Sequence, residues 1–373
     1  MRLVDVEADE AKRIPTGVAE LDRVLGGGLV PASLVLVGGE PGVGKSTLLL
    51  SALAAISKER RALLVTGEES TAQVKLRAAR LGGAGNVEIL AETELETVCA
   101  TLERERPEVC VIDSVQTLYS SEIGSAPGSV AQVREAAARH LVDCVLQFEG
   151  DRYHAHRVLR AVKNRFGSTN ELGVFEMTGT GLVGVPEPSE LFGRGAEGEV
   201  GAAVACALEG TRPILLEIQA LVAPTDLAMP RRVATGVDPK RLAMIVAVLS
   251  RHARVALGSA DVFVNVAGGV RIDEPGADLP VALAIASAAR GAAVKEATAA
   301  FGEIGLTGRL RAATQAERRL EECAKFGLRQ VVAPAGTPNG KLSMLEAETL
   351  GRAIRAGLDV DGSEGRYAST RTC

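Results

Sequence analysis

Apolar and polar residues alternate along the chain in blocks that predict short strands and amphipathic helices. In the first half, the predicted strands cover residues 33–37, 61–66, 87–90, 109–113 and 142–148, and the predicted helices cover residues 18–25, 47–53, 70–81, 94–106 and 130–139. Strands that alternate with helices are typical of a parallel sheet covered by helices. We therefore expect an α/β domain over residues 1–190.

The pattern changes after about residue 198. Strands are predicted at residues 200–208, 214–221, 262–266 and 302–306, helices at residues 240–251, 279–290 and 315–326, and further elements at 330–333 and 345–356. This order predicts an α+β domain over residues 198–361. The polar tail at residues 362–373 is expected to be disordered.

Composition is that of a soluble, two-domain protein. The chain has 373 residues, 46% hydrophobic and 24% charged, with a formal net charge of −5, which argues against a uniformly basic nucleic-acid binder but leaves room for a local basic strip. The six cysteines form no C-x-x-C pair, as expected of free thiols in a reducing compartment. No apolar stretch reaches membrane-spanning length without a charge or a glycine. We expect a cytoplasmic protein without a membrane partner.

One motif carries the clearest chemistry. Residues 39–46 read G-x-x-x-x-G-K-S between a predicted strand and a predicted helix. A loop of this kind turns its backbone N–H groups around a phosphate at a helix N-terminus, while the lysine reaches the β- and γ-phosphates and the Ser hydroxyl binds Mg²⁺. The predicted nucleotide-binding residues are Gly39, Glu40, Pro41, Gly42, Val43, Gly44, Lys45, Ser46 and Thr47.

Carboxylates follow two of the predicted strands. Asp113 ends an apolar strand, and at that position it is expected to support Mg²⁺ together with Ser46. Glu68 and Glu69 follow the strand at 61–66, where a carboxylate can orient or deprotonate the attacking water. A helix-capping role is the alternative for either glutamate. Glu68, nearer the strand end, is the predicted catalytic residue.

A basic segment at residues 152–165 contrasts with the acidic chain, because it holds five Lys or Arg residues and no acid after Asp151. Its alternation predicts a strand with charges near one edge. These cations either form a solvated face or contact a phosphate, of nucleic acid or of a neighbouring subunit's nucleotide. His154 and His156 share a strand face, but no third metal ligand accompanies them.

Four of these motifs together resemble the bacterial RadA family of DNA repair proteins: the phosphate loop, the G-E-E-S at 67–70, the Asp113 strand and the K-N-R-F-G at 163–167. The residues 188–192, P-S-E-L-F, look like the junction between that family's domains. The resemblance implies a RecA-like ATPase that binds ATP and Mg²⁺. It would work as a ring of six subunits on single-stranded DNA and recombination intermediates, beside a RecA-type recombinase. Lys163 and Arg165 would then act in catalysis across a subunit interface, or on DNA.

Two departures from the family stand out. Its four-cysteine zinc module is missing, so no zinc is expected in this chain. Only 29 residues separate Asp113 from Asp143, which leaves no room for a further strand beside the expected loop and helix. The missing strand would be inserted between Arg139 and Leu141, and it would lie near the centre of the sheet. Its loss puts DNA-coupled hydrolysis in question.

The second domain resembles the C-terminal domain of Lon proteases. That chemistry needs a Ser nucleophile and a Lys base. The segment 275–281 contains no serine, and Glu317 stands where the lysine is expected. We expect this domain to build the ring and to offer basic residues to DNA, with Arg231, Arg232, Lys240, Arg241, Arg251 and Arg254 as candidates.

The leading hypothesis from the sequence is an ATP-dependent DNA motor of recombination that promotes branch migration. The alternatives are an ATP-binding scaffold with impaired hydrolysis, because of the internal shortening, and a Lon-type protease, which the missing Ser–Lys pair disfavours.

Overall fold

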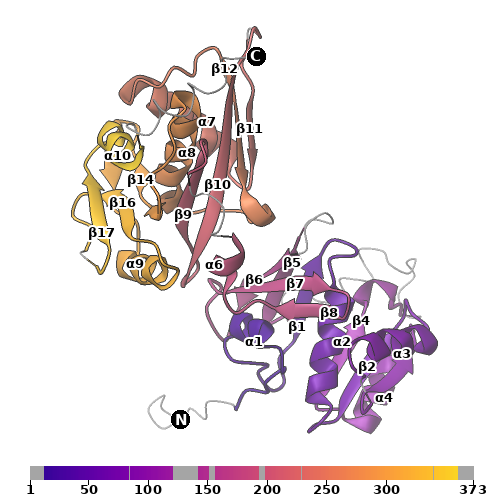
Figure 1. The fold of residues 1–373 in the computed structure, drawn as a ribbon. Helices are drawn as coiled ribbons and strands as arrows, with labels where there is room; N and C mark the ends of the chain where they lie inside the picture. The colour runs from indigo at the N-terminus through magenta and orange to yellow at the C-terminus, as the bar shows by residue number, and fades with distance from the viewer. Residues whose placement is uncertain are drawn as a thin grey trace, which may run out of the picture. The chain divides into compact units, whose positions relative to one another are not determined.

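The computed structural model divides the chain into two units, Met1–Pro186 and Glu187–Cys373. It describes residues 12–83, 85–120, 142–150, 156–192, 198–227, 229–338 and 340–359. The predicted helix at 130–139, His154 and the tail at 362–373 lie outside these residues. Figure 1 shows the helices and strands of both units.

The first unit alternates helices and strands, as the sequence predicted. In chain order its elements are α1 (Ala19–Leu25), β1 (Val35–Gly39), α2 (Lys45–Ile56), β2 (Ala62–Thr66), α3 (Thr71–Arg80), β3 (Glu88–Ala91), α4 (Leu95–Glu105), β4 (Val109–Asp113), the 3₁₀ turn η2 (Val115–Thr117), β5 (Cys144–Glu149), β6 (His156–Asn164), β7 (Leu172–Thr178) and β8 (Gly181–Gly184).

These strands form two sheets where the pattern predicted one. The first sheet has the order β3-β2-β4 and is parallel throughout. The second has the order β1-β5-β6-β7-β8, in which β1 and β5 are parallel and the other pairs are antiparallel. Within the described residues, no strand pairing joins β1 to β4. The break lies where the short spacing between Asp113 and Asp143 predicts a missing central strand.

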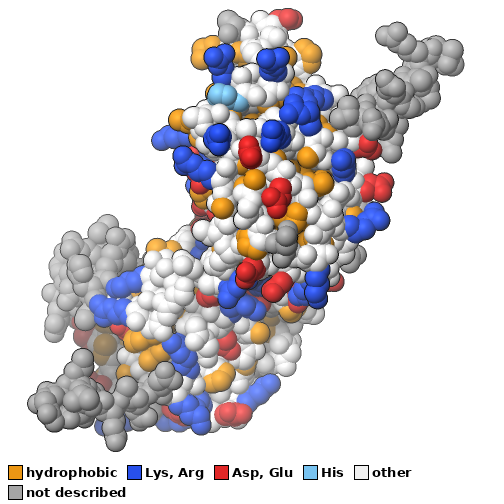
Figure 2. Space-filling view, turned by 90° about the vertical axis from the view of Figure 1, so that its left-hand side faces the viewer, with side chains coloured by type: hydrophobic (Ala, Val, Ile, Leu, Met, Phe, Trp, Pro, Cys, Tyr) orange, Lys and Arg blue, Asp and Glu red, His pale blue; other side chains and the backbone are white. Residues whose placement is uncertain are grey.

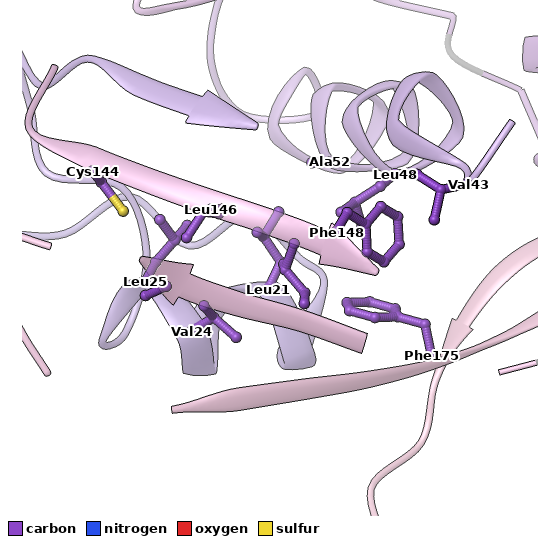
Figure 3. Close-up of a cluster of buried hydrophobic side chains, with 12 residues drawn as sticks. Leu21, Val24, Leu25, Val43, Leu48, Ala52, Cys144, Leu146, Phe148 and Phe175 are labelled. Atoms are coloured by element: carbon purple, nitrogen blue, oxygen red, sulfur yellow. The ribbon is translucent and has the colours of Figure 1, made fainter. Parts of the chain in front are cut away.

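Helix α2 holds the two sheets together, because its side chains enter two separate clusters. Leu48 and Ala52 pack with Leu146 and Phe148 of β5, in the cluster that Figure 3 shows. On the other side, Leu53 and its neighbours Leu50 and Ile56 pack with β2. In the first cluster, the rings of Phe148 and Phe175 meet edge to face, with centroids 5.8 Å apart.

The second unit is built on one continuous sheet. Its elements are α6 (Pro188–Phe192), β9 (Ala202–Glu209), β10 (Arg212–Pro224), β11 (Arg232–Thr235), α7 (Pro239–His252), β12 (Ala260–Val266), η3 (Ala267–Gly269), η4 (Pro275–Ala277), α8 (Asp278–Arg290), β13 (Thr298–Ala300), β14 (Glu303–Ile304), β15 (Leu310–Arg311), α9 (Ala316–Lys325), β16 (Gln330–Pro334), β17 (Ser343–Ala347) and α10 (Leu350–Gly357). The sheet has the mixed order β11-β12-β10-β9-β13-β16-β17.

Helix α8 packs against β9 and β10 of this sheet and is buried from Asp278 to Ser287. The strand predicted at 302–306 was too long: only β14 forms, and it pairs with β15 as a separate hairpin. The reason is a tight turn after β14, in which the Gly308 amide donates to the Gly305 carbonyl and the Gly305 amide donates to the Arg309 carbonyl. None of the helices in the described parts of either unit has both the length and the apolar character needed to cross a membrane.

Candidate nucleotide-binding site

The phosphate loop lies between the end of β1 and the start of α2, as its motif requires. Three of its glycines have positive φ: Gly39 (150°), Gly42 (81°) and Gly44 (112°). A Cβ on Gly39 would lie 2.4 Å from the Phe148 carbonyl oxygen, and a Cβ on Gly44 would lie 2.9 Å from Leu182 Cδ1. Only glycine fits at these two positions, because both the backbone conformation and the close neighbours exclude a side chain.

The Lys45 side chain folds back over this loop. Its Nζ donates to the Gly39 carbonyl at 2.7 Å and to the Glu40 carbonyl at 2.9 Å. The first-turn amides of α2, including those of Ser46 and Thr47, have no partner within the helix and carry the positive end of its dipole. The loop therefore offers a lysine cation, backbone amides and the Ser46 hydroxyl around one point, a donor set that fits a nucleotide triphosphate.

The strand-end carboxylates belong to the other sheet. β2 and β4 are neighbours with Thr66 opposite Asp113, and the Gly67 amide donates to the Asp113 carbonyl at 3.3 Å. The Ser114 hydroxyl donates to Glu68 Oε1 at 2.5 Å. Thus Glu68 lies beside the residue that follows Asp113, and the two predicted carboxylates come from adjacent strand ends.

Glu69 has a different environment from Glu68. Its carboxylate forms an ion pair with Arg77 of α3, and its backbone N–H donates to the Thr66 hydroxyl. Ser70 caps α3 by a capping box with Gln73. These contacts give Glu69 a structural role and favour Glu68 as the carboxylate available to water. Sequence reasoning missed Ser114 as the partner of Glu68, although a hydroxyl directly after a strand-end aspartate was a signal for it.

The site suits a magnesium nucleotide better than a bare metal ion. Among the described residues, no three His, Cys, Asp or Glu side chains cluster as metal ligands. Protein-bound Mg²⁺ usually takes one or two protein oxygens and completes its shell with substrate phosphates and water. Ser46 and Asp113 are the residues that would hold it here, and the ion would neutralise charge on the phosphates.

Lys163 and Arg165 lie at the opposite end of the β1 sheet from the phosphate loop. Asn164 is opposite Cys144, and Cys144 is opposite Val35 at the start of β1, whereas Gly39 at the end of β1 is opposite Phe148. Four residues of strand separate the two ends, about 13 Å at 3.3 Å per residue. These two cations therefore do not reach the phosphate loop of their own chain.

Both cations are held by neighbouring backbone and carboxylate groups. Lys163 Nζ donates to the Val142 carbonyl at 2.6 Å, and Arg165 lies 3.0 Å from Asp143 Oδ1. The Leu34 amide donates to the other oxygen of Asp143. This amide, with the Arg165 guanidinium and the Lys163 charge, lowers the pKa of Asp143 below its usual value.

The other two arginines of β6 also have partners within the first unit. Arg157 is buried and donates to the His156 carbonyl at 2.8 Å. Arg160 lies 3.7 Å from Glu149 on the neighbouring strand. All four described cations of the basic segment therefore have partners within the first unit, and the phosphate contact of Lys163 and Arg165 stays a prediction.

In the second unit, ion pairs occupy the region in which the sequence suggested the remains of a protease site. Arg241 pairs with Asp278, whose carboxylate also accepts the Ile304 amide at 3.0 Å. Arg319, with no exposed side-chain surface, pairs with Glu274 at 2.6 Å. Glu317 is exposed on α9. Residues 275–281 contain no serine, and Glu317 stands at the position expected for the lysine, so these positions supply neither member of a Ser–Lys pair.

Three of the predicted DNA-contacting arginines have partners within the second unit, although Arg231 is exposed. Arg231 pairs with Asp261, Arg232 donates to the carbonyls of Leu257 and Ala260, and Arg241 pairs with Asp278. Lys240, Arg251 and Arg254 are exposed. Figure 2 shows Lys and Arg side chains gathered on the upper part of the second unit.

Two family models match parts of the chain. The model "ATPase: KaiC" matches residues 14–106, which include the phosphate loop, Glu68 and α4. The model "Subunit ChlI of Mg-chelatase" matches residues 240–337 of the second unit.

Curated relatives align with about nine-tenths of the chain. The chain is 46% identical to a DNA repair protein RadA of Halalkalibacterium halodurans over 366 residues, covering 89% of this chain and 80% of the relative. It is 48% identical to the protein of that name in Brucella abortus (89% and 79% covered) and 44% identical to the one in Escherichia coli (90% and 80% covered).

These comparisons also bear on the length of the chain. Since 89% of 373 residues is about 332, the 366 aligned positions of the Halalkalibacterium relative include about 34 that have no counterpart here. That difference is enough for one strand with its loops. With identities of 44–48% over about nine-tenths of its length, the chain belongs to the RadA family of DNA repair proteins.

Proposed function

We propose that this chain is an ATP-dependent DNA repair enzyme that hydrolyses ATP on single-stranded DNA and recombination intermediates. The observation that carries the proposal is that the first unit holds both a phosphate loop with Lys45 folded over it and, at the strand ends of its other sheet, Glu68 beside Ser114 and Asp113. These are the parts that phosphoryl transfer to water requires. Such a site supplies binding, charge stabilisation and a water-orienting carboxylate.

The finer mechanism we propose is a ring, with six subunits as the expected number, in which each subunit completes its neighbour's site. Lys163 and Arg165 lie at the far end of the β1 sheet from the phosphate loop, so the nucleotide they serve is on another subunit, or the phosphate they contact is DNA. A cation supplied in trans couples hydrolysis to assembly, because developing charge on the phosphates is stabilised only when subunits meet.

In this proposal the second unit builds the ring and carries exposed Lys240, Arg251 and Arg254 toward DNA. Each contact to a backbone phosphate would add affinity that salt weakens. The proposed setting is the cytoplasm, with a RecA-type recombinase as partner and branch migration as the outcome of the motor.

A second candidate function has its own supporting observation. The break between β1 and β4 separates the phosphate loop from Glu68 and Asp113, which belong to different sheets. An ATP-binding scaffold that assembles but does not turn over is the function that this break favours.

The deciding experiment measures ATP binding and ATP turnover with and without single-stranded DNA. The motor predicts turnover that DNA raises, and the scaffold predicts binding without turnover. Lys45→Ala should abolish binding, whereas Lys163→Ala should keep binding and lower turnover by at least tenfold. The control is Lys58→Ala, an exposed lysine just after α2, which should behave like the unmodified chain. Undiminished turnover of Lys163→Ala would remove the trans-acting role.

A further inference from the structure

Arg13 connects two loops that lie far apart in the sequence. Its Nη1 donates to the Leu25 carbonyl at 2.9 Å and to the Gly28 carbonyl at 3.3 Å. Its Nη2 donates to the Phe166 carbonyl at 2.6 Å. One guanidinium therefore ties the glycine loop after α1 to the turn that follows Lys163 and Arg165.

The glycine loop has the shape that this contact needs. Gly26, Gly27 and Gly28 have φ of 81°, 112° and 124°, and a Cβ on Gly28 would lie 2.5 Å from the Ile14 carbonyl oxygen. The loop therefore lies directly against the chain just after Arg13. A Cβ on Gly167 would lie 3.9 Å from Gly26 Cα, so the turn and the loop also touch each other.

Besides Arg13, the turn is held by hydrogen bonds and by the Arg165–Asp143 ion pair. The Asn164 side chain accepts the Phe166 amide at 3.0 Å, and the Arg165 amide donates to the Asp143 carbonyl at 3.0 Å. Phe166 is exposed, as are Arg165 and Gly167. Hydrophobic burial therefore contributes little to the conformation of the turn, and directed hydrogen bonds must fix it.

Arginine is the side chain suited to this task. Its planar fork presents several donors in fixed directions, so it can hold three carbonyls of two loops at once, whereas a lysine ammonium is a single point on a flexible stem. We infer that Arg13 is a positioning residue that holds the 163–167 turn, and with it Lys163 and Arg165, in the orientation needed to contact a neighbouring subunit's nucleotide. This inference rests on the trans-acting role proposed above.

The first test measures amide hydrogen exchange in the full chain. In Arg13→Lys, we expect the amides of Gly26, Gly27 and Phe166 to exchange about tenfold faster, while those of β7 stay unchanged. The control is Arg23→Lys on α1, whose side chain lies 3.6 Å from Glu20 and contacts neither loop carbonyl. Unchanged exchange in the turn, or equal acceleration throughout the first unit, would overturn the positioning role.

The second test mixes variant subunits. Arg13→Lys has an intact phosphate loop and a loosened turn. Lys45→Ala has a defective phosphate loop and an intact turn. We expect Arg13→Lys alone to lose about tenfold in turnover with an unchanged KM for ATP, and an equal mixture with Lys45→Ala to recover several-fold over the two separate chains. No recovery would overturn the action on a neighbour. If the unmodified chain does not turn over ATP, the proposed hydrolysis fails, and the exchange experiment alone decides the role of Arg13.

Discussion

The two units differ in how they complete a β-sheet. In the second unit, seven strands pair without interruption, and β9 and β10 lie inside the sheet with neighbours on both sides. In the first unit, β1 and β4 each lack a partner on one side, within the described residues. β2, which has partners on both sides, is buried at all five positions, whereas β1 and β4 are half-buried at all of theirs. The burial of an apolar strand thus depends on its neighbours as much as on its composition.

The break in the first unit has a consequence for the nucleotide site. The phosphate loop follows β1 of one sheet, and Glu68 and Asp113 follow β2 and β4 of the other. Helix α2 packs against β1, β2 and β4 and begins with Lys45. A magnesium nucleotide bound to the loop and to Asp113 would therefore join two sheets that both pack against this helix.

Amide hydrogen exchange gives the largest expected contrast between the units. In a parallel ladder, about half of a strand's amides face each neighbour. The amides of β1 and β4 that face the break should exchange on the order of 10³-fold faster than the amides of β2 or β10. The amides of β2 and β10 exchange only when the unit unfolds, at a free-energy cost of about 5 kcal/mol. Amides of the outer strands β3 and β17 give the reference for an ordinary edge. Full protection of β1 and β4 would show that another strand fills the space between them.

Breaking the buried ion pair of the second unit should destabilise that unit alone. Arg319→Met leaves the Glu274 carboxylate without its cation, and breaking a buried pair in this way costs about 3–5 kcal/mol of unfolding free energy. Denaturant unfolding should show the loss in the second unit's transition and leave the first unit's transition in place. Arg318→Met is the control, because this exposed neighbour donates only to the Thr211 carbonyl. A loss shared by both transitions would mean that the units do not unfold independently.

The sequence predicted the elements around the phosphate loop because their signals are local. An apolar run, glycines with required positive φ and a helix that begins at Lys45 follow one another without a gap. The short spacing before Asp143 also indicated a lost strand. What local patterns did not show was how charges are paired. From the sequence, Arg157 and Arg241 are expected to be surface cations, but Arg157 is buried and Arg241 pairs with the buried Asp278.

The same limit applies to the candidate site. Glu68 and Glu69 are adjacent, and the sequence gives both the same chemistry. Their different environments come from other elements: Ser114 contacts Glu68, and Arg77 forms an ion pair with Glu69. Arg13 had no sequence signal at all, since its partner Phe166 is 153 residues away. Long-range contacts of this kind depend on the fold, whereas glycine loops and apolar strands depend mainly on nearby residues.

Nucleotide binding should stabilise the first unit alone. At a free MgATP concentration of 100 times Kd, a ligand that binds only the folded state adds about 2.7 kcal/mol. Calorimetry should show the first unit's transition moving to higher temperature while the second unit's transition stays in place. Lys45→Ala should abolish the shift, and Lys58→Ala should keep it. A shift in both transitions would contradict the independence of the two units.

Thiol labelling extends the comparison to single side chains. Burial raises the pKa of Cys110, on β4, to about 11, and it also raises the pKa of the fully buried Cys206 thiol on β9. Because Cys110 is only half-buried at the open edge of its sheet, its thiolate should react with iodoacetamide in the native state. Between pH 7 and 9 the rate should rise about tenfold per pH unit and should not depend on low denaturant. Cys206 should react only when the second unit unfolds, so its rate should rise with denaturant.

The exposed Cys99 serves as the reference for reagent activity. Peptide mass spectrometry separates the three sites, and a denaturant-dependent rate at Cys110 would show that β4 is as well enclosed as the strands of the continuous sheet.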